Sequence, residues 1–225
     1  MEHVESNART ANVEKYYGAR AGEYDATVKY WNPRAAAGVE DIKSRYRAAL
    51  KGQDVLEIAC GTGFWTEVAV STAHSVVATD RDPTLVSIVR HKLSSAANLR
   101  CQVADAYALE TVTGPFTAAF AQFWWSHIPK SKIRSFLAVL HTKLSRGALV
   151  LFSDDWPYKH EGTRRFDAAG NLLEDRLLRN GDRFEIIKNF PTEFELRTVL
   201  KGFADELTYV QCPAYGYWML SYRTV

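Results

Sequence analysis

Acidic side chains and glycines follow two apolar runs early in the chain, and they are the residues best placed to do chemistry. Glu57 ends the run 54–58, which leads into a loop containing Gly61 and Gly63, and Asp80 follows the next apolar run. Glycine lets a backbone turn sharply and approach a ligand where any side chain would clash. A glycine pair alone is weak evidence, because such turns occur in many α/β proteins. The carboxylates beside it indicate a ligand that tolerates negative charge.

The same loop discriminates between two kinds of nucleotide-derived ligand. A dinucleotide site follows the pattern G-x-G-x-x-G, whose helix N-terminus receives a pyrophosphate. Here the third glycine position is Thr66, preceded by the bulky Phe64 and Trp65, and Glu57 would stand close to negative phosphates. S-adenosylmethionine has no phosphate and carries a sulfonium and an ammonium group, so a carboxylate favours it. The sign of the charge therefore predicts S-adenosylmethionine and disfavours a nicotinamide-dependent dehydrogenase.

The sequence also predicts a fold that would bring these residues together. Short apolar runs alternate with helical stretches, which is typical of a parallel α/β sheet. The expected strands cover 54–58, 75–79, 99–103, 116–123 and 148–152. The expected helices cover 64–72, 83–93 (opened by Pro83) and 131–145 (closed by Gly147). Ligands of such sheets bind outside the carboxyl ends of the strands. One edge should therefore hold Glu57, Gly61, Gly63, Asp80, Asp105 and the 123–127 loop.

The segments flanking this core differ from it. The first 50 residues are predicted to be helical and are rich in tyrosine, and we expect them to cap the carboxyl edge. Residues 171–189 predict a hairpin around Asn180-Gly181, a strong two-residue turn signal. A helix at 192–202 and an antiparallel pair of strands should follow. We expect a single domain over 1–225, with a helical cap (1–50), a cofactor-binding core (51–155), an insertion with the hairpin (156–190) and a C-terminal helix with antiparallel strands (191–225).

Three stretches carry a resemblance to a known family. VLEIACGTGFWT (55–66) resembles the glycine-rich first motif of the class I S-adenosylmethionine-dependent methyltransferases, VVATDRDP (76–83) is similar to their second motif, and CQVADAYAL (101–109) to their third. The tyrosine-rich YYGARAGEYDA near the start is similar to a segment that caps the pocket in small-molecule members. The resemblance implies an α/β fold: a Rossmann-like, mostly parallel seven-stranded sheet with helices on both faces, an antiparallel C-terminal strand and a helical N-terminal cap.

The resemblance also implies roles for the residues at the strand ends. Glu57 and the glycine-loop backbone would contact the methionine part of the cofactor, and Asp80 would hold the ribose hydroxyls. Asp105 would accept from the adenine amino group. In this chain Ala59 replaces the usual first glycine, a small substitution. The full expected cofactor set is Glu57, Ala59, Gly61, Gly63, Asp80, Arg81, Asp105, Ala106, Phe123, Tyr16 and Tyr24.

Aromatic and basic residues beyond the fourth strand are the candidates for the acceptor side. His127, in FWWSHIPK, is the expected general base, because a histidine with a pKa of about 6.5 can take a proton at neutral pH. The alternative is that His127 only positions substrate or packs beside the cofactor. Trp124 and Trp125 could contact adenine or an aromatic substrate, with at least one expected in the core. His160 and Arg164 are expected to contact the substrate from the insertion.

Composition bears on partners and compartment. With a net charge of +2 over 225 residues, no concentrated basic surface for nucleic acid is expected, and no apolar run approaches a membrane span. The three scattered cysteines lie in no Cys/His cluster, so neither a disulfide framework nor a metal site is predicted. The absence of a secretory signal pattern together with unpaired cysteines favours the cytoplasm.

The sequence therefore predicts a monomer or homodimer that transfers a methyl group to an O, N or C atom of a small, aromatic or hydrophobic metabolite. A nucleic-acid or protein methyltransferase is the first alternative. The chain has Gln122-Phe123-Trp124-Trp125 where amino-methylating DNA enzymes carry (N/D)-P-P-(Y/F). A protein that binds S-adenosylmethionine without turnover is the second alternative.

Overall fold

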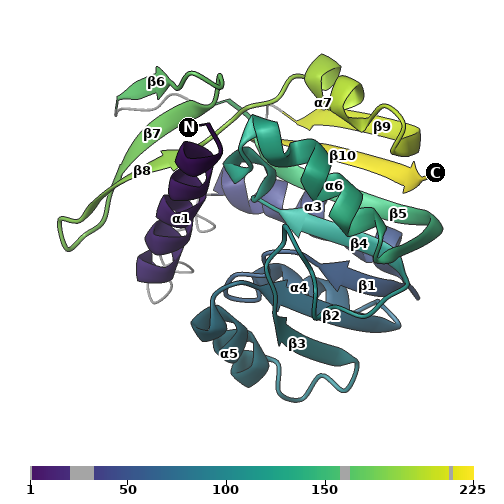
Figure 1. Ribbon diagram of the computed structural model, residues 1–225. Helices are drawn as coiled ribbons and strands as arrows, with labels where there is room; N and C mark the ends of the chain where they lie inside the picture. Colours follow the sequence, from purple (N-terminus) through teal and green to yellow (C-terminus); the bar gives the residue numbers. More distant parts are fainter. Residues whose placement is uncertain (1, 21–32, 158–162, 213–214) are drawn as a thin grey trace.

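A mostly parallel sheet organises the chain (Figure 1). The structure is a computed structural model, and it describes residues 2–20, 33–157, 163–212 and 215–225. The seven strands lie in the order β3-β2-β1-β4-β5-β10-β9. They cover Asp54–Glu57 (β1), Ser75–Asp80 (β2), Leu99–Val103 (β3), Phe116–Gln122 (β4), Leu144–Asp155 (β5), Ala204–Cys212 (β9) and Tyr217–Thr224 (β10).

The pairing of these strands places their carboxyl ends at one edge. Strands β1 to β5 pair in parallel, with β1 between β2 and β4. Strand β10 runs antiparallel between β5 and β9. Chain connections lead away on opposite sides of β1, so the sheet has its switch point there, where open α/β sheets bind ligands. This is the predicted sheet, including its antiparallel C-terminal strand.

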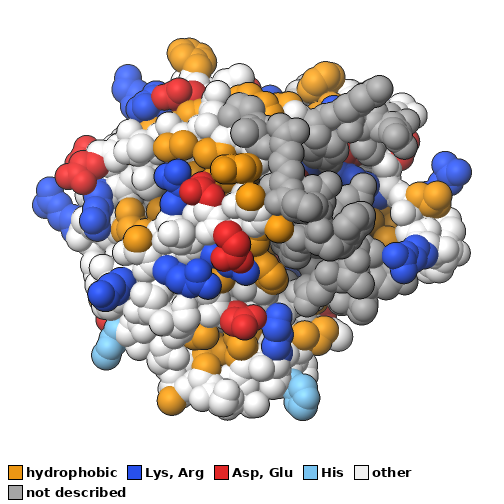
Figure 2. All heavy atoms as spheres, turned by 180° about the vertical axis from the view of Figure 1, so that it is seen from behind, with side chains coloured by type: hydrophobic (Ala, Val, Ile, Leu, Met, Phe, Trp, Pro, Cys, Tyr) orange, Lys and Arg blue, Asp and Glu red, His pale blue; other side chains and the backbone are white. Residues whose placement is uncertain are grey.

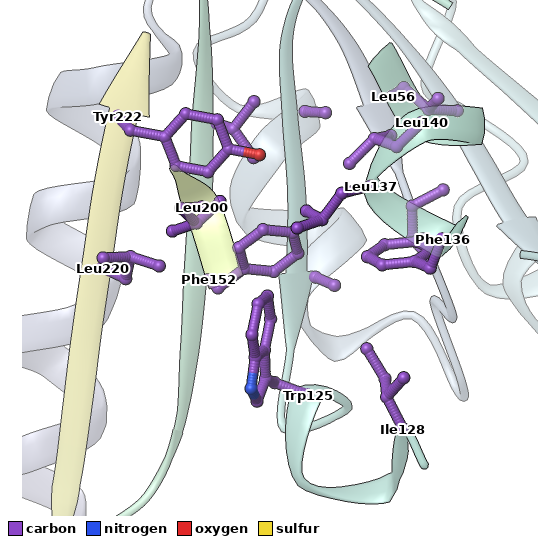
Figure 3. Packing of buried hydrophobic residues seen from close by; sticks show 14 of the residues in the cluster. Leu56, Trp125, Ile128, Phe136, Leu137, Leu140, Phe152, Leu200, Leu220 and Tyr222 are labelled. Carbon is purple, nitrogen blue, oxygen red and sulfur yellow. The ribbon is translucent and has the colours of Figure 1, made fainter. Parts of the chain in front are cut away.

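Both faces of the sheet are covered by helices because side chains alternate along each strand. One face buries Leu56, Ala119 and Val150, and the other buries Val55, Phe120 and Leu151. The first face packs against α6 (Ile133–His141) and α7 (Glu193–Leu200), and Figure 3 shows Phe136 and Leu137 of α6 beside Phe152. The second face packs against α3 (Pro33–Leu50), α4 (Phe64–Val70) and α5 (Pro83–Lys92).

A second, three-stranded sheet stands beside the carboxyl edge. It consists of β6 (Arg164–Phe166), β7 (Leu172–Leu177) and β8 (Arg183–Ile187), all antiparallel. Helix α1 (Glu2–Arg20) lies along β8 (Figure 1), where Val13 and Tyr16 bury their side chains with Ile186. The three-stranded sheet therefore supports α1, and α1 forms a wall beside the edge where the strand ends lie.

Three local expectations differ from the structure. The helix expected over 131–145 ends at His141, and Gly147 lies inside β5 at a φ of 74°, where the register with β4 shifts. The hairpin turn is a three-residue loop rather than two residues, because the amide of Leu178 donates to the carbonyl of Asp182. The cap expected over residues 1–50 consists of two helices with different positions. Helix α3 packs on a face of the sheet, and of the two described helices only α1 lines the cavity at the carboxyl edge.

None of the described helices has the length and apolar character that crossing a bilayer requires.

Candidate functional site

A cavity of about 540 Å³ lies at the carboxyl ends of β1, β2, β3 and β4. This volume falls within the roughly 300–1,000 Å³ of small-molecule sites. Helix α1 closes one side, with Val13 and Tyr17 lining the cavity and Gly18 standing against Asp82. The expected site residues that line it are Glu57, Ala59, Gly61, Asp80, Arg81, Asp105, Ala106, Phe123, Trp124 and His127. The switch point of the sheet is thus a cavity that α1 bounds on one side.

The loop after β1 bends around the cavity through residues of left-handed conformation. Ala59, Gly61 and Gly63 have φ values of 54°, 55° and 81°. Gly63 precedes α4, and a Cβ there would come within 3.0 Å of the Val89 side chain on α5. The amide of Gly61 donates to Oδ2 of Asp80 over 2.9 Å. Glycine at 63 is thus favoured by its left-handed conformation and by close packing against Val89, while Gly61 lines the cavity.

Asp80 joins two loops at the end of β2. Its Oδ1 accepts from the amide of Asp82 over 3.0 Å, and Oδ2 accepts from Gly61. Burial raises the pKa of Asp80, and these backbone donors oppose that effect. Asp82 in turn accepts from the Thr84 amide and caps α5, with Pro83 in its first turn. The carboxylate of Asp80 therefore has a fixed orientation at the cavity.

Glu57 carries an unsatisfied buried oxygen. Its side chain is 2% exposed, and Oε2 has no hydrogen-bond partner. Burial, reinforced by nearby Asp80, raises the pKa of Glu57 to about 8. Glu57 pairs with Phe120 of β4, and Gln122 lies two residues further along that strand. Gln122 also lines the cavity, its side chain is 8% exposed, and neither its amide oxygen nor its amide nitrogen has a hydrogen-bond partner. A buried polar group without a hydrogen-bond partner lowers stability by about 1–3 kcal/mol. The unpaired atoms of Glu57 and Gln122 therefore fit a ligand with a cation and polar oxygens, such as the amino-acid end of S-adenosylmethionine.

The residues after β3 form the far end of the cavity. Asp105 accepts from the Tyr107 amide over 2.8 Å, which fixes its carboxylate. Arg81 approaches Asp105 at 3.9 Å, and both side chains are partly exposed. Ala106 and Tyr107 line the cavity beside them. This end offers a carboxylate, a guanidinium and a ring, which suits a polar heterocycle such as adenine.

His127 is held at both ring nitrogens. Nδ1 lies 2.6 Å from the carbonyl oxygen of Ile187, and Nε2 lies 2.8 Å from the hydroxyl of Tyr17. The side chain is 3% exposed. Burial and the positive charges of Lys188 and Arg176 lower the pKa of His127 to about 3. The histidine is therefore neutral at physiological pH, and its expected role as general base stays a prediction.

The remaining expected residues are dispersed. Trp124 lines the cavity and packs edge-on against Phe136, whereas Trp125 lies in the core beside Phe152 and does not line it. Tyr16 lies outside the cavity lining and packs edge-on against Phe184. Arg164 lies away from the cavity and donates from Nε to buried Glu174 over 2.7 Å. The expectations for Tyr24 and His160 concern positions outside the described residues.

Sequence reasoning missed Tyr17 and Gln122, and it missed a buried charge cluster behind His127. Lys188, 4% exposed, donates to Oγ of Ser126 and contacts Asp154 at 3.1 Å and Asp155 at 2.7 Å. Burial lowers the pKa of Lys188, but the two carboxylates outweigh that and raise it well above its ordinary value. The YY pair at 16–17 was a signal for Tyr17, and the end of β4 was a signal for Gln122.

Comparison with known proteins agrees with this geometry. A family model described as "Methyltransferase domain" matches residues 55–147. A structure titled "DhpI-SAH complex" is 26% identical, covers 96% of this chain and 97% of its own, and has a TM-score of 0.73. A second, "DhpI-SAM-HEP complex", is 25% identical over the same shares with a TM-score of 0.75.

More distant structures share the fold. SAM-bound CalS10 from Micromonospora echinaspora, described as an amino pentose methyltransferase, is 17% identical, covers 90% of this chain and 96% of its own, and has a TM-score of 0.65. A search of curated protein sequences gave no significant match. The matched domain spans the strand-end residues from Glu57 to Asp105, and the similar structures extend over nearly the whole chain. The chain therefore carries a methyltransferase domain over residues 55–147, and nearly its whole length shares the fold of structures solved with SAM or SAH.

Proposed function

We propose that this enzyme methylates a small molecule inside the cavity between the sheet edge and α1. The observation that carries the proposal is the wall that α1 places over the carboxyl edge. Tyr17 and Gly18 line the same cavity as Glu57 and Asp80. A cofactor bound along the ends of β1 to β3 would fill only part of the 540 Å³ cavity. The remaining part, near Tyr17, Trp124 and His127, would hold the acceptor. That space suits a metabolite rather than a folded chain or a duplex.

The cofactor side follows from the strand ends. When bound, S-adenosylmethionine supplies a methyl group activated by its positive sulfur. Glu57 and Gln122 would hold its amino-acid end, because both have buried atoms without partners. Asp80 would accept from the ribose hydroxyls. The larger group that would surround the cofactor is Ala59, Gly61, Gly63, Arg81, Asp105, Ala106 and Phe123.

Catalysis would rest mainly on alignment. Methyl transfer is an in-line displacement, and holding the nucleophile about 3–3.5 Å from the methyl carbon in the right orientation can supply roughly 7–11 kcal/mol. Trp124 and Tyr17 both line the cavity, and on the acceptor side they would set that orientation. Helix α1 would also keep water from one side of the site. The aromatic lining favours an acceptor with a hydrophobic or planar part.

Surface charge is consistent with a small acceptor. On the face shown in Figure 2, Lys and Arg side chains are interspersed with Asp and Glu among the coloured residues, without a continuous basic stripe. Nucleic-acid enzymes depend on concentrated positive charge to neutralise phosphates. The described part of this face therefore offers no concentrated basic surface for a nucleic acid.

The test is a product search. The protein is incubated with methyl-labelled S-adenosylmethionine and the low-molecular-weight fraction of a cell extract, and products heavier by one methyl group are sought by mass spectrometry. Parallel reactions receive RNA, DNA and the protein fraction. Label in a small metabolite supports the proposal. Label only in a macromolecule, or cofactor binding without any transfer, would show that the proposal is wrong.

A further inference from the structure

The direction of one hydrogen bond at the cavity can be assigned from chemistry alone. The carbonyl oxygen of Ile187 has no hydrogen, so the hydrogen in its 2.6 Å contact with His127 belongs to Nδ1. Burial and two neighbouring positive charges keep the ring neutral, so Nε2 carries a lone pair. The hydrogen in the 2.8 Å contact with Tyr17 must then come from the tyrosine hydroxyl.

This assignment determines what Tyr17 can offer to a ligand. A phenol has one hydrogen to donate, and the Tyr17 hydrogen is committed to His127. Toward the cavity, which Tyr17 lines, the oxygen can only accept. A ligand group that meets it must therefore bring its own hydrogen. A carboxylate has none at neutral pH, whereas a hydroxyl or an amine has one and still keeps a lone pair for the methyl carbon.

Buried contacts fix this pair in place. Ser126 precedes His127 in the chain, and Lys188 follows Ile187. The two residues of the His127–Ile187 hydrogen bond are therefore each next to a residue of the Ser126–Lys188 contact. Nζ of Lys188 donates to Oγ of Ser126 over 2.9 Å and to Asp154 over 3.1 Å. Oδ2 of Asp154 accepts from the Ser126 amide over 2.8 Å. The segment that carries His127 is thus held to the end of β5 through Ser126, and the ring of His127 is held to β8 through the Ile187 carbonyl.

We propose that Tyr17 is the residue that contacts the methyl acceptor, that His127 is a positioning residue which orients the Tyr17 hydroxyl, and that the methylated atom is an oxygen or nitrogen bearing a hydrogen. This inference rests on the proposed function and narrows its substrate class to hydroxyl and amine compounds. Carboxylates and carbon acceptors fall outside the class.

The step balances for both kinds of acceptor. The carbon–sulfur bond breaks with its electron pair left on sulfur, which becomes a neutral thioether, while the acceptor lone pair forms the new bond to carbon. For a hydroxyl, the product oxonium is a far stronger acid than imidazolium. Its hydrogen passes to the oxygen of Tyr17 as the hydrogen of Tyr17 passes to Nε2 of His127. For an amine, the product ammonium keeps its hydrogen, and Tyr17 only orients it.

The transfer test uses three variants and one control. Tyr17→Phe removes only the hydroxyl, His127→Gln keeps an oxygen that can accept from Tyr17, and His127→Leu keeps none. Tyr209→Phe is the matched control, because Tyr209 lies on β9 away from the cavity lining. Each is assayed for labelled product from the low-molecular-weight extract and for cofactor affinity by calorimetry.

We expect Tyr17→Phe to lower product formation about a hundredfold for a hydroxyl acceptor, the scale of general acid–base catalysis, and about tenfold for an amine, the scale of one hydrogen bond. His127→Gln should retain more activity than His127→Leu, cofactor affinity should stay within about twofold, and Tyr209→Phe should match the wild type. Full activity in Tyr17→Phe, or a methyl ester as product, would overturn the inference.

A second measurement does not depend on finding the acceptor. In protein labelled with ¹⁵N-histidine, NMR of the cofactor-bound enzyme should show His127 with its hydrogen on Nδ1, and Tyr17→Phe should shift the Nε2 resonance. A hydrogen on Nε2 would overturn the inference. If the wild type binds cofactor but transfers no methyl group to any metabolite, the proposed function fails, and the NMR result separately decides the orientation of Tyr17.

Discussion

Cofactor affinity is expected to rise with pH up to about 8, because Glu57 must lose a proton before it can pair with a cation. Burial raises the pKa of this carboxyl to about 8 in the ligand-free enzyme. A bound ammonium group would restore the ionised form, so binding releases one proton at neutral pH. One proton corresponds to a change in Kd of up to about tenfold per pH unit. Above pH 8 the gain from Glu57 should level off.

The same carboxyl affects stability with a definite sign. Between its ordinary value of 4.5 and the folded value of about 8, the folded state holds the proton and the unfolded chain releases it. The folded state binds more protons in this window, so the free energy of unfolding falls as pH rises through it. The full difference corresponds to about 5 kcal/mol. Glu57→Gln should remove this part of the pH dependence.

Calorimetry can separate Glu57 from the ligand. S-adenosylmethionine is titrated into wild-type and Glu57→Gln protein at several pH values, in pairs of buffers with different ionisation enthalpies. The amino group of the ligand titrates in both proteins, so the difference between the curves isolates Glu57. We expect net proton release near pH 7 in the wild type alone, and affinity about 10- to 100-fold weaker in the variant at pH 8, the worth of one charged hydrogen bond. Identical pH slopes in the two proteins would refute the reasoning.

Two further predictions concern stability in urea. Lys188→Met should lower the free energy of unfolding by about 3–5 kcal/mol, because it leaves fully buried Asp154 without its cation. Lys130→Met, which removes an exposed ion pair, should lower it by less than about 1 kcal/mol. Equal losses in the two variants would contradict the argument. Gly63→Ala should cost roughly 1–3 kcal/mol through a φ of 81° and contact with α5. Gly52→Ala, with a similar φ but open space, should cost less, and a reversed order would count against the packing explanation.

The strand ends could be predicted because parallel strands bring their carboxyl ends to one edge. Glu57, Asp80 and Asp105 each follow an apolar run, and the cavity gathers all three. The charge of these residues distinguished a sulfonium ligand from a phosphate-bearing one before any geometry was available. The part of the site that could be predicted is therefore the set of carboxylates at the ends of successive parallel strands.

Other features depended on contacts that no local pattern encodes. Gly147 can adopt the same left-handed conformation at a helix end or inside an irregular strand, and only the pairing of β5 with β4 decides between them. Tyr16 and Tyr17 are neighbours on α1, but about 100° of helical rotation sends one to Phe184 and the other to His127. Lys188 and Asp154 are 34 positions apart, so their pairing required the folded arrangement of β5 and β8.

The placement of β10 has a consequence for synthesis on the ribosome. This strand comes later in the chain than the other six of its sheet, yet it lies between β5 and β9 and buries Trp218, Leu220 and Tyr222. A nascent chain that has produced the cofactor-binding strands still exposes the hydrogen-bonding edge of β5, a site where other chains can pair. Only when residues 217–224 emerge does that edge close. Chaperone demand during translation should therefore persist until these eight residues leave the exit tunnel.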